Sequence, residues 1–254
     1  MKWCIVIPQA TVTAGNTKLG MTVAAWSLPP GKEHTCPGET SACRVSCYAK
    51  SGFFRMPSTK DAHEKNMALS QQDDFVSWML AKLRVMGAPV MRVHVSGDYY
   101  SAEYIRKWRQ IVSQTSVQFY SYTRSWRVSR LLPELMQLSA APNMHMWWSL
   151  DKDASDAPYV SGIRRAYMAV DDADAAAAPA DCDLVFRVKG GGTRTIMKKA
   201  NSVFVCPPEN GVKLANPITC SRCGFCWSSR KPGWEKALWD APDSNSEVVD
   251  ILAT

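Results

Sequence analysis

Three cysteines, Cys36, Cys43 and Cys47, stand close together in a stretch that contains a Pro-Gly bend. Thiolates are soft ligands that suit iron–sulfur clusters and zinc. Three of them on one loop can converge on one centre, so their spacing predicts a metal site. His34 precedes the group and is an alternative fourth ligand, although we interpret it as an exposed loop histidine.

A second group contains Cys220, Cys223 and Cys226 in a C-x2-C-x2-C pattern, with Cys206 followed by proline upstream. Zinc fingers and ribbons take two ligands from each of two separated knuckles. Three cysteines at intervals of three plus a remote Cys-Pro are closer to a ferredoxin-type pattern, in altered order. We therefore favour a [4Fe–4S] cluster here, with zinc or a set of buried free thiols as alternatives.

The composition indicates a folded protein of the cytosol. The chain of 254 residues is 46% hydrophobic and 21% charged, and it lacks an apolar run long enough to cross a membrane. Its first residues do not resemble a signal peptide, so we expect a reducing cytosol in which clustered thiols serve metal or redox chemistry. Cys4 and Cys182 stand alone and are expected to be buried as small hydrophobic residues. The net charge of +7 is compatible with a nucleic-acid partner without requiring one.

Strands alternate with helices along the chain, which predicts parallel βαβ units. Strands are expected at residues 21–28, 90–96, 117–122, 144–150, 166–170, 184–188 and 202–206, and helices at 59–69, from 73, from 101, at 129–139 and at 156–165. We favour an incomplete (β/α) barrel of about six parallel strands. A doubly wound sheet is the alternative, but no Gly-x-Gly-x-x-Gly follows the first strand. Residues 1–205 would form this barrel with a cluster loop at 36–48, and residues 206–254 a cysteine-rich segment and acidic tail on the same domain.

Several strands carry polar residues on one alternate face and charges at their carboxyl ends. These residues are Arg92, His94 and Ser96 leading to Asp98, Tyr120 and Tyr122 leading to Arg124, His145, Trp147 and Ser149 leading to Asp151, and Arg187 with Lys189. A barrel builds its active site at the carboxyl ends of its strands. Each residue alone is more often a hydrogen-bonded core residue, but the convergence of four strands indicates a site.

The three-cysteine loop after the first strand and the Ser96-Gly97-Asp98 turn after the second resemble the radical S-adenosylmethionine (SAM) superfamily. Five motifs resemble the phage gene product 88 family more closely. They are Cys36-Pro-Gly, Cys43-x3-Cys47-Tyr48-Ala49, His94-Val-Ser-Gly-Asp98, Tyr122-Thr-Arg-Ser-Trp126 and Cys220-x2-Cys223-x2-Cys226-Trp227, within residues 22–227. The resemblance implies a radical SAM-like barrel whose three loop cysteines hold a [4Fe–4S] cluster with SAM on the open iron. The loop spacing here is C-x6-C-x3-C, whereas the superfamily uses C-x3-C-x2-C.

The same resemblance implies roles for individual residues. Ser96, Gly97 and Asp98 would meet the SAM amino group, and Tyr48 would pack near the cluster. The candidate catalytic residues are Asp98, His94, Tyr122 and Arg124. Cys206, Cys220, Cys223 and Cys226 would hold an auxiliary cluster, or both cysteine groups would share one cluster. We expect a monomer in the host cytosol if the protein is phage-encoded, with an electron donor as a partner.

A second hypothesis is a non-enzymatic iron–sulfur or zinc protein that binds nucleic acid or a host protein. Its metal would hold loops together, because metal binding energy becomes folding energy. The basic surface would contain Arg124, Arg127, Arg130, Arg164, Arg165, Lys198 and Lys199, with Trp126 stacking on bases. An ordinary solvated face is the alternative interpretation of these charges.

Overall fold

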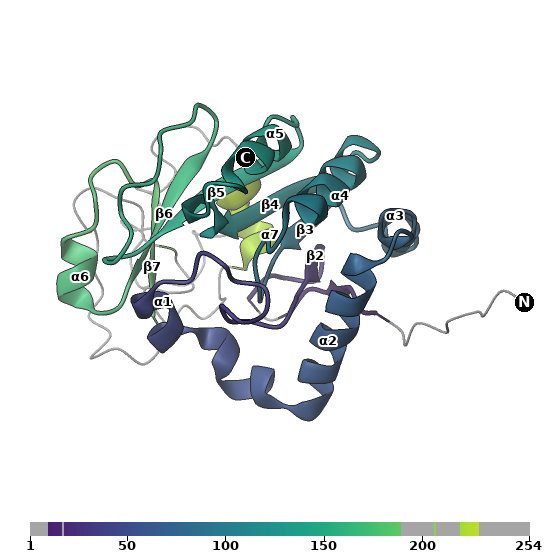
Figure 1. Ribbon diagram of the computed structural model, residues 1–254, viewed down its shortest axis with the longest axis horizontal. Coiled ribbons are helices and arrows are strands. Elements are labelled where there is room, and N and C mark those ends of the chain that lie inside the picture. The colour runs from purple at the N-terminus through teal and green to yellow at the C-terminus, as the bar shows by residue number, and fades with distance from the viewer. Residues whose placement is uncertain (1–9, 17, 189–205, 207–218, 229–254) are drawn as a thin grey trace, which may run out of the picture.

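The centre of the protein is a seven-stranded, mostly parallel sheet (Figure 1). The computed structural model describes residues 10–16, 18–188, 206 and 219–228. The strands are β1 (Thr13–Ala14), β2 (Val23–Trp26), β3 (Val90–Val93), β4 (Gln118–Thr123), β5 (Met144–Leu150), β6 (Arg164–Ala169) and β7 (Leu184–Arg187). They lie side by side in sequence order, with β2 to β7 parallel and β1 antiparallel to β2.

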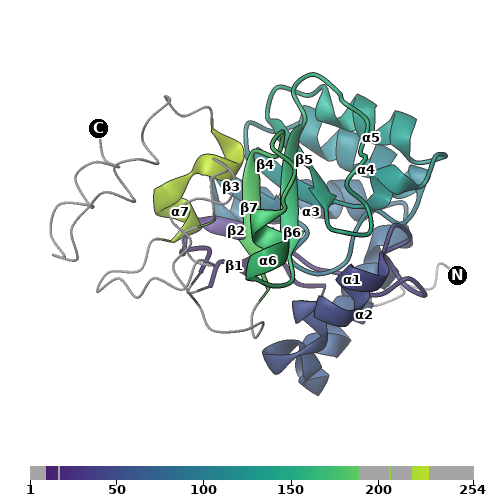
Figure 2. The same cartoon turned by 90° about the vertical axis from the view of Figure 1, so that its left-hand side faces the viewer.

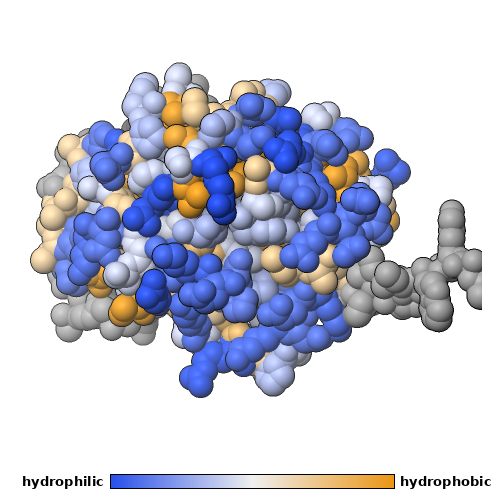
Figure 3. Space-filling model, in the orientation of Figure 1, coloured by the Kyte–Doolittle hydropathy of each residue, from blue (hydrophilic) through white to orange (hydrophobic). Residues whose placement is uncertain are grey.

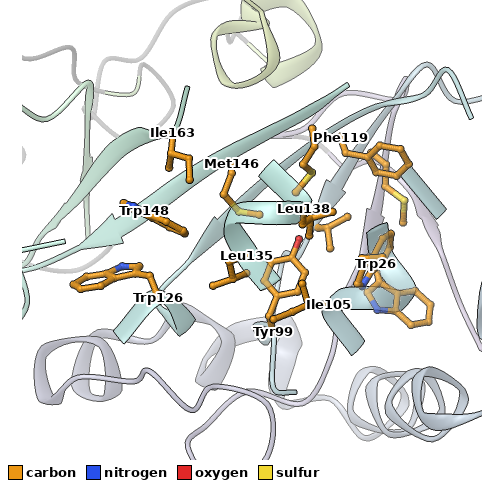
Figure 4. Packing of buried hydrophobic residues seen from close by; sticks show 14 of the residues in the cluster. Trp26, Tyr99, Ile105, Phe119, Trp126, Leu135, Leu138, Met146, Trp148 and Ile163 are labelled. Carbon is orange, nitrogen blue, oxygen red and sulfur yellow. The ribbon is translucent and has the colours of Figure 1, made fainter. Parts of the chain in front are cut away.

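Helices pack on one face of this sheet. They are α2 (Pro57–Gln71), α3 (Phe75–Met86), α4 (Ala102–Ser113), α5 (Leu132–Ser139) and α6 (Asp172–Ala176). Their apolar residues join inward-facing strand residues such as Trp26, Met146 and Trp148 in one buried cluster (Figure 4). The helix α4 illustrates the cause, because Ser101 caps its amino end and Ile105, Trp108 and Ile111 repeat on its buried stripe.

The opposite face of the sheet carries the C-terminal cysteine segment. Figure 2 shows α7 (Cys220–Cys223) on the other side of the strands from α4 and α5. A short 3-10 helix, η5 (Phe225–Trp227), follows it. Alternation along each strand places Tyr120 and Trp147 on this face, where they pack against residues of the segment. The segment therefore supplies a cover for the face that the helices leave open.

The observed topology bears on the two predicted architectures. A doubly wound sheet reverses its strand order at a switch point, whereas β2 to β7 keep one order with helices on one face. The doubly wound alternative is therefore wrong for the described strands. The sheet is open in the described part of the chain, with β1 and β7 at its edges.

Most predicted elements are present with shifted ends. The strand at 144–150 matches β5, while the strand at 90–96 ends at Val93. The predicted helix at 156–165 is wrong, because the chain there is irregular and its last two residues begin β6. The strand at 202–206 lies outside the described residues, apart from Cys206.

The face seen in Figure 3 is largely hydrophilic, with small apolar patches that are separated from one another. Among the helices that the structure describes, none has the length and apolar character needed to cross a membrane.

Candidate metal centres

The first cysteine group follows β2, at the carboxyl ends of the parallel strands. The turn before Cys36 is closed by two contacts with Gly31, whose backbone N–H donates to Cys36 Sγ at 3.4 Å and whose carbonyl accepts from Cys36 N at 3.0 Å. Backbone N–H groups that face a cysteine sulfur tune iron–sulfur centres. The turn thus presents Cys36 in a conformation that suits a thiolate ligand.

Cys43 lies in the short helix α1 (Ser41–Ser46), which a network of buried polar groups fixes to the sheet. Thr40 caps α1 by accepting from Cys43 N at 3.0 Å, and its hydroxyl donates to Asp151 Oδ2 at 2.6 Å. Asp151 also pairs with Arg124 Nε at 3.0 Å. Because Asp151 follows β5 and Arg124 follows β4, the network fixes Cys43 above the ends of both strands.

A close backbone approach at Gly38 completes the attachment of the loop. A Cβ atom on Gly38 would lie 2.0 Å from the carbonyl oxygen of Arg124, so only glycine fits there. Arg127 Nη1 donates to the carbonyl of Gly38 at 2.8 Å. The Cys36–Cys47 loop is therefore attached by backbone contact as well as by side chains.

The three thiols of this loop lie near enough for their charges to interact. Burial raises the pKa of Cys36 to about 12, with further contributions from Asp98, Cys43 and Cys47. Burial also raises the pKa of Cys43, and the positive charge of Arg124 opposes this shift. Without a metal, both thiols are therefore protonated at neutral pH. Metal binding would displace their protons.

The second cysteine group packs on the opposite face of the sheet. Cys220 N donates to Lys18 O and Ser221 N to Leu19 O, both at 2.9 Å, so the segment attaches to the turn before β2. Cys206 N donates to Val185 O at 3.0 Å, which brings Cys206 alongside β7. The α1 and α7 helices are well separated in both views of the molecule (Figures 1 and 2). The two cysteine groups therefore occupy different places.

Side chains of strands β4, β5 and β6 contact Cys226 and its neighbour Phe225. The Tyr122 hydroxyl donates to Cys226 Sγ at 2.8 Å, and Trp147 Nε1 donates to Cys226 O at 3.0 Å. Arg164 donates to the carbonyls of Phe225 and Cys226, each at 2.7 Å, and its guanidinium lies 3.9 Å from the centre of the Trp147 ring. These contacts fix the position of the cysteine segment over β4, β5 and β6.

Two polar groups beneath this segment lack, within the described part of the chain, the partner that their burial would require. The Tyr120 hydroxyl is buried and has no hydrogen-bond partner there. Arg92 has no carboxylate partner among the described residues. Its guanidinium donates to His94 O at 3.1 Å and lies 5.6 Å from the Tyr122 ring. Burial would lower the pKa of Arg92, but nearby tyrosines and Cys220 raise it above its ordinary value.

The arrangement suits an anionic thiolate centre. A bound metal–thiolate group would offset the Arg92 charge and accept from the Tyr120 hydroxyl, and buried polar groups normally have such partners. Among the described residues, no three Cys, His, Asp or Glu side chains converge closely enough to hold one metal ion. A closed zinc site needs sulfurs about 3.8 Å apart, from tetrahedral bonds of about 2.3 Å. A four-iron cluster is larger and takes more widely spaced sulfurs, so the cluster stays a prediction for these cysteines.

The Ser96-Gly97-Asp98 turn after β3 joins the chain after β2 to the end of β4. Ser96 Oγ donates to Leu28 O at 2.9 Å. Asp98 accepts from Tyr99 N at 2.7 Å, Thr123 Oγ1 at 2.6 Å and Arg124 N at 2.8 Å. Burial raises the pKa of Asp98, and these hydrogen bonds oppose the shift. Both side chains thus have protein partners, and their contact with SAM stays a prediction.

The His94 ring packs among aromatic residues of the helix-side core. Because β3 ends at Val93, the alternation predicted through residue 96 is wrong, and His94 enters the core on the helix side. Its Nε2 is 2.8 Å from the Tyr104 hydroxyl, and its ring packs edge-on against Tyr99. Its catalytic role stays a prediction. Tyr48 lies near the loop and donates to Val95 O.

The basic surface proposed for nucleic acid is only partly present. Trp126 is buried and donates to Ser149 O. Arg124 pairs with Asp151, and Arg164 donates to Phe225 O. Arg127 and Arg130 are exposed. Arg165 pairs with Asp181. Lys198 and Lys199 lie outside the described residues, as does Cys4. His34 is exposed and Cys182 is buried, as expected.

Sequence reasoning missed Thr40 and did not link Arg92 or Arg164 to the cysteines. A Thr three residues before Cys43 is a helix-cap signal that could have been found. Arg164 opens β6, whereas the sequence predicts a helix that ends at residue 165, so its contact with the cysteine segment does not follow from the sequence. No local signal reveals that Arg92 lacks an acidic partner, because that depends on segments distant in sequence.

The fold and the sites define an α/β protein with cysteine groups at the carboxyl edge and on one face of a mostly parallel sheet. The chain belongs to the gene product 88 family, which matches residues 8–229. No curated protein and no solved structure matches it. The resemblance to the phage gene product 88 family is therefore confirmed, and the one to radical SAM proteins stays a prediction.

Proposed function

We propose that the protein is an iron–sulfur protein with two separate centres. The observation that supports this most strongly is the surroundings of the C-terminal cysteines. Among the described residues Arg92 has no acidic partner and the Tyr120 hydroxyl has no hydrogen-bond partner, while Tyr122 donates to Cys226 Sγ; together these favour a negatively charged thiolate centre. Its ligands would be Cys206, Cys220, Cys223 and Cys226.

The N-terminal centre would be held by Cys36, Cys43 and Cys47. Three cysteines satisfy three of the four irons of a [4Fe–4S] cluster, which leaves one iron open to another ligand. The site lies at the carboxyl ends of parallel strands, where α/β enzymes of barrel type place their chemistry. The network of Thr40, Asp151 and Arg124 would keep the loop in one conformation as the metal binds.

The finer part of the proposal is radical SAM chemistry on a barrel-like scaffold. Cys36, Cys43 and Cys47 would hold the cluster with SAM beside it, and the two groups together would supply radical chemistry for hydrogen abstraction from a substrate. Tyr48 and Asp98 would flank that site, while Arg124 would offset negative charge near Cys43. An external electron donor would be needed. The one-way strand order is compatible with such a scaffold.

Anaerobic purification and reconstitution test the iron–sulfur proposal. We expect a brown protein with iron and sulfide near eight per chain, from two four-iron clusters. Changing Cys226 or Cys43 to serine should each remove about half of the iron, while Cys182→Ser, in the helix-side core, should remove none. Zinc as the sole metal, or equal iron in all three variants, would refute the proposal.

The SAM part has its own test. The reconstituted protein is reduced with dithionite in the presence of SAM, and 5′-deoxyadenosine is measured by mass spectrometry. Cys43→Ser should abolish the product, whereas Cys182→Ser should keep it. A fully loaded, reduced protein that makes no 5′-deoxyadenosine would remove the radical chemistry and leave the iron–sulfur assignment intact.

A further inference from the structure

Arg92 lies between the two cysteine groups. On one side its Nη2 is 3.5 Å from the hydroxyl of Tyr48, the residue after Cys47. On the other side its guanidinium lies 5.6 Å from the ring of Tyr122, whose hydroxyl donates to Cys226 Sγ. The Arg92 guanidinium on β3 therefore contacts Tyr48 beside the first cysteine group and Tyr122 beside the second.

The charge of Arg92 needs an explanation. A partly buried guanidinium is costly without an anion, and no carboxylate among the described residues pairs with Arg92. Within that part of the chain it has only one carbonyl bond, to His94 O, and one ring contact, with Tyr122, whereas the other strand arginines are held more closely. Arg164 stacks on Trp147 and donates to two carbonyls, and Arg187 pairs with Asp172. Around Arg92 the groups able to become negative are tyrosines and cysteines.

We propose that Arg92 is a shared counter-charge that couples the two centres electrostatically. This inference rests on the proposed iron–sulfur function and concerns how the centres influence each other. A fixed positive charge stabilises the more negative, reduced state of a nearby cluster and so raises its reduction potential. Because Arg92 contacts Tyr48 as well as Tyr122, the charge on either centre acts on the same guanidinium. Arg92 is a positioning residue and takes no part as a ligand.

The first test isolates the C-terminal centre in a Cys43→Ser/Cys47→Ser background and measures its reduction potential by an EPR-monitored titration. Arg92→Met should disfavour reduction at least tenfold, which lowers the potential by about 59 mV. Arg92→Lys keeps the charge and should keep most of the potential. Arg84→Met removes an exposed arginine from α3, on the helix side, and serves as the matched control.

The second test measures coupling in the protein with both centres. Filling the N-terminal centre should shift the potential of the C-terminal centre, and Arg92→Met should remove most of that shift. If Arg92→Met does not fold, Arg92→Gln removes the charge while keeping a polar side chain, and circular dichroism reports folding of each variant.

The outcomes separate this inference from the proposed function. A background protein without iron would overturn both the second centre and the coupling. A protein with a normal iron content whose potential is the same with arginine, methionine or glutamine at position 92 would overturn the role of Arg92 alone.

Discussion

Acid should destabilise this protein through His94. The Trp26 indole donates to the Tyr104 hydroxyl at 3.0 Å, so that hydroxyl is free to donate its own proton to His94 Nε2 at 2.8 Å. His94 Nδ1 is buried without a partner. This arrangement suits a neutral imidazole, and burial, with the charge of Arg92 as a second cause, lowers the pKa of His94 to about 3.

The size and sign of the effect follow from proton linkage. In the unfolded chain His94 has a pKa near 6.5, so the unfolded state binds a proton between about pH 6.5 and 3 while the folded state does not. The stabilising contribution is therefore complete above pH 6.5 and is lost as the pH falls. Each pH unit below 6.5 costs about 1.4 kcal/mol, which gives a loss of about 2 kcal/mol between about pH 7.5 and 5.

Urea unfolding of the native protein and of His94→Gln at these two pH values measures this loss. Glutamine cannot take up the proton, so the variant should be less stable at neutral pH but lose about 2 kcal/mol less on acidification. The difference between the two proteins isolates His94 from His63 and His145, whose pKa values burial also lowers. An equal loss of unfolding free energy in both proteins would refute a buried neutral His94. Loss of stability that is explained entirely by metal release would refute it as well.

Three further substitutions test the packing around the sites. Gly38→Ala should push the cysteine loop off Arg124 O, and iron loading should fall with it, while alanine at an exposed glycine leaves loading unchanged. Asp151→Asn should cost roughly 3–5 kcal/mol in urea unfolding, because it leaves the Arg124 charge buried without its partner; a cost below about 1 kcal/mol would contradict the network. Lys107→Met should cost about 2 kcal/mol, since Lys107 Nζ donates to three carbonyls at the end of α2; an unchanged melting temperature would argue against this cap.

Local patterns in the sequence were sufficient for most strands of the sheet and for the two cysteine groups, but not for β1 or for the end of β3. Strand β5 could be predicted because its alternation of residue types matches its two faces, and α4 because its apolar spacing and Ser101 cap act within one helix. The site at the carboxyl ends of the strands follows from parallel pairing, which brings the residues after β3, β4 and β5 to one edge.

Long-range packing decided the rest. The short strand β3 ends before His94, and the His94 side chain points into the helix-side core. No periodicity in that stretch predicts this orientation. The Cys36–Cys47 loop was recognised from its spacing alone, but its attachment through Thr40 and Asp151 joins residues far apart in the chain. Contacts of this kind depend on where distant segments pack, so local sequence patterns do not predict them.

The sequence by itself determined that thiolate chemistry is available in two places, because cysteine spacing is a local property. Only the tertiary structure decided that these places are apart, one at the edge of the sheet and one on its face. It also decided that Arg92 stands between them with no acidic partner among the described residues, since the charge balance of a side chain depends on every segment that packs around it.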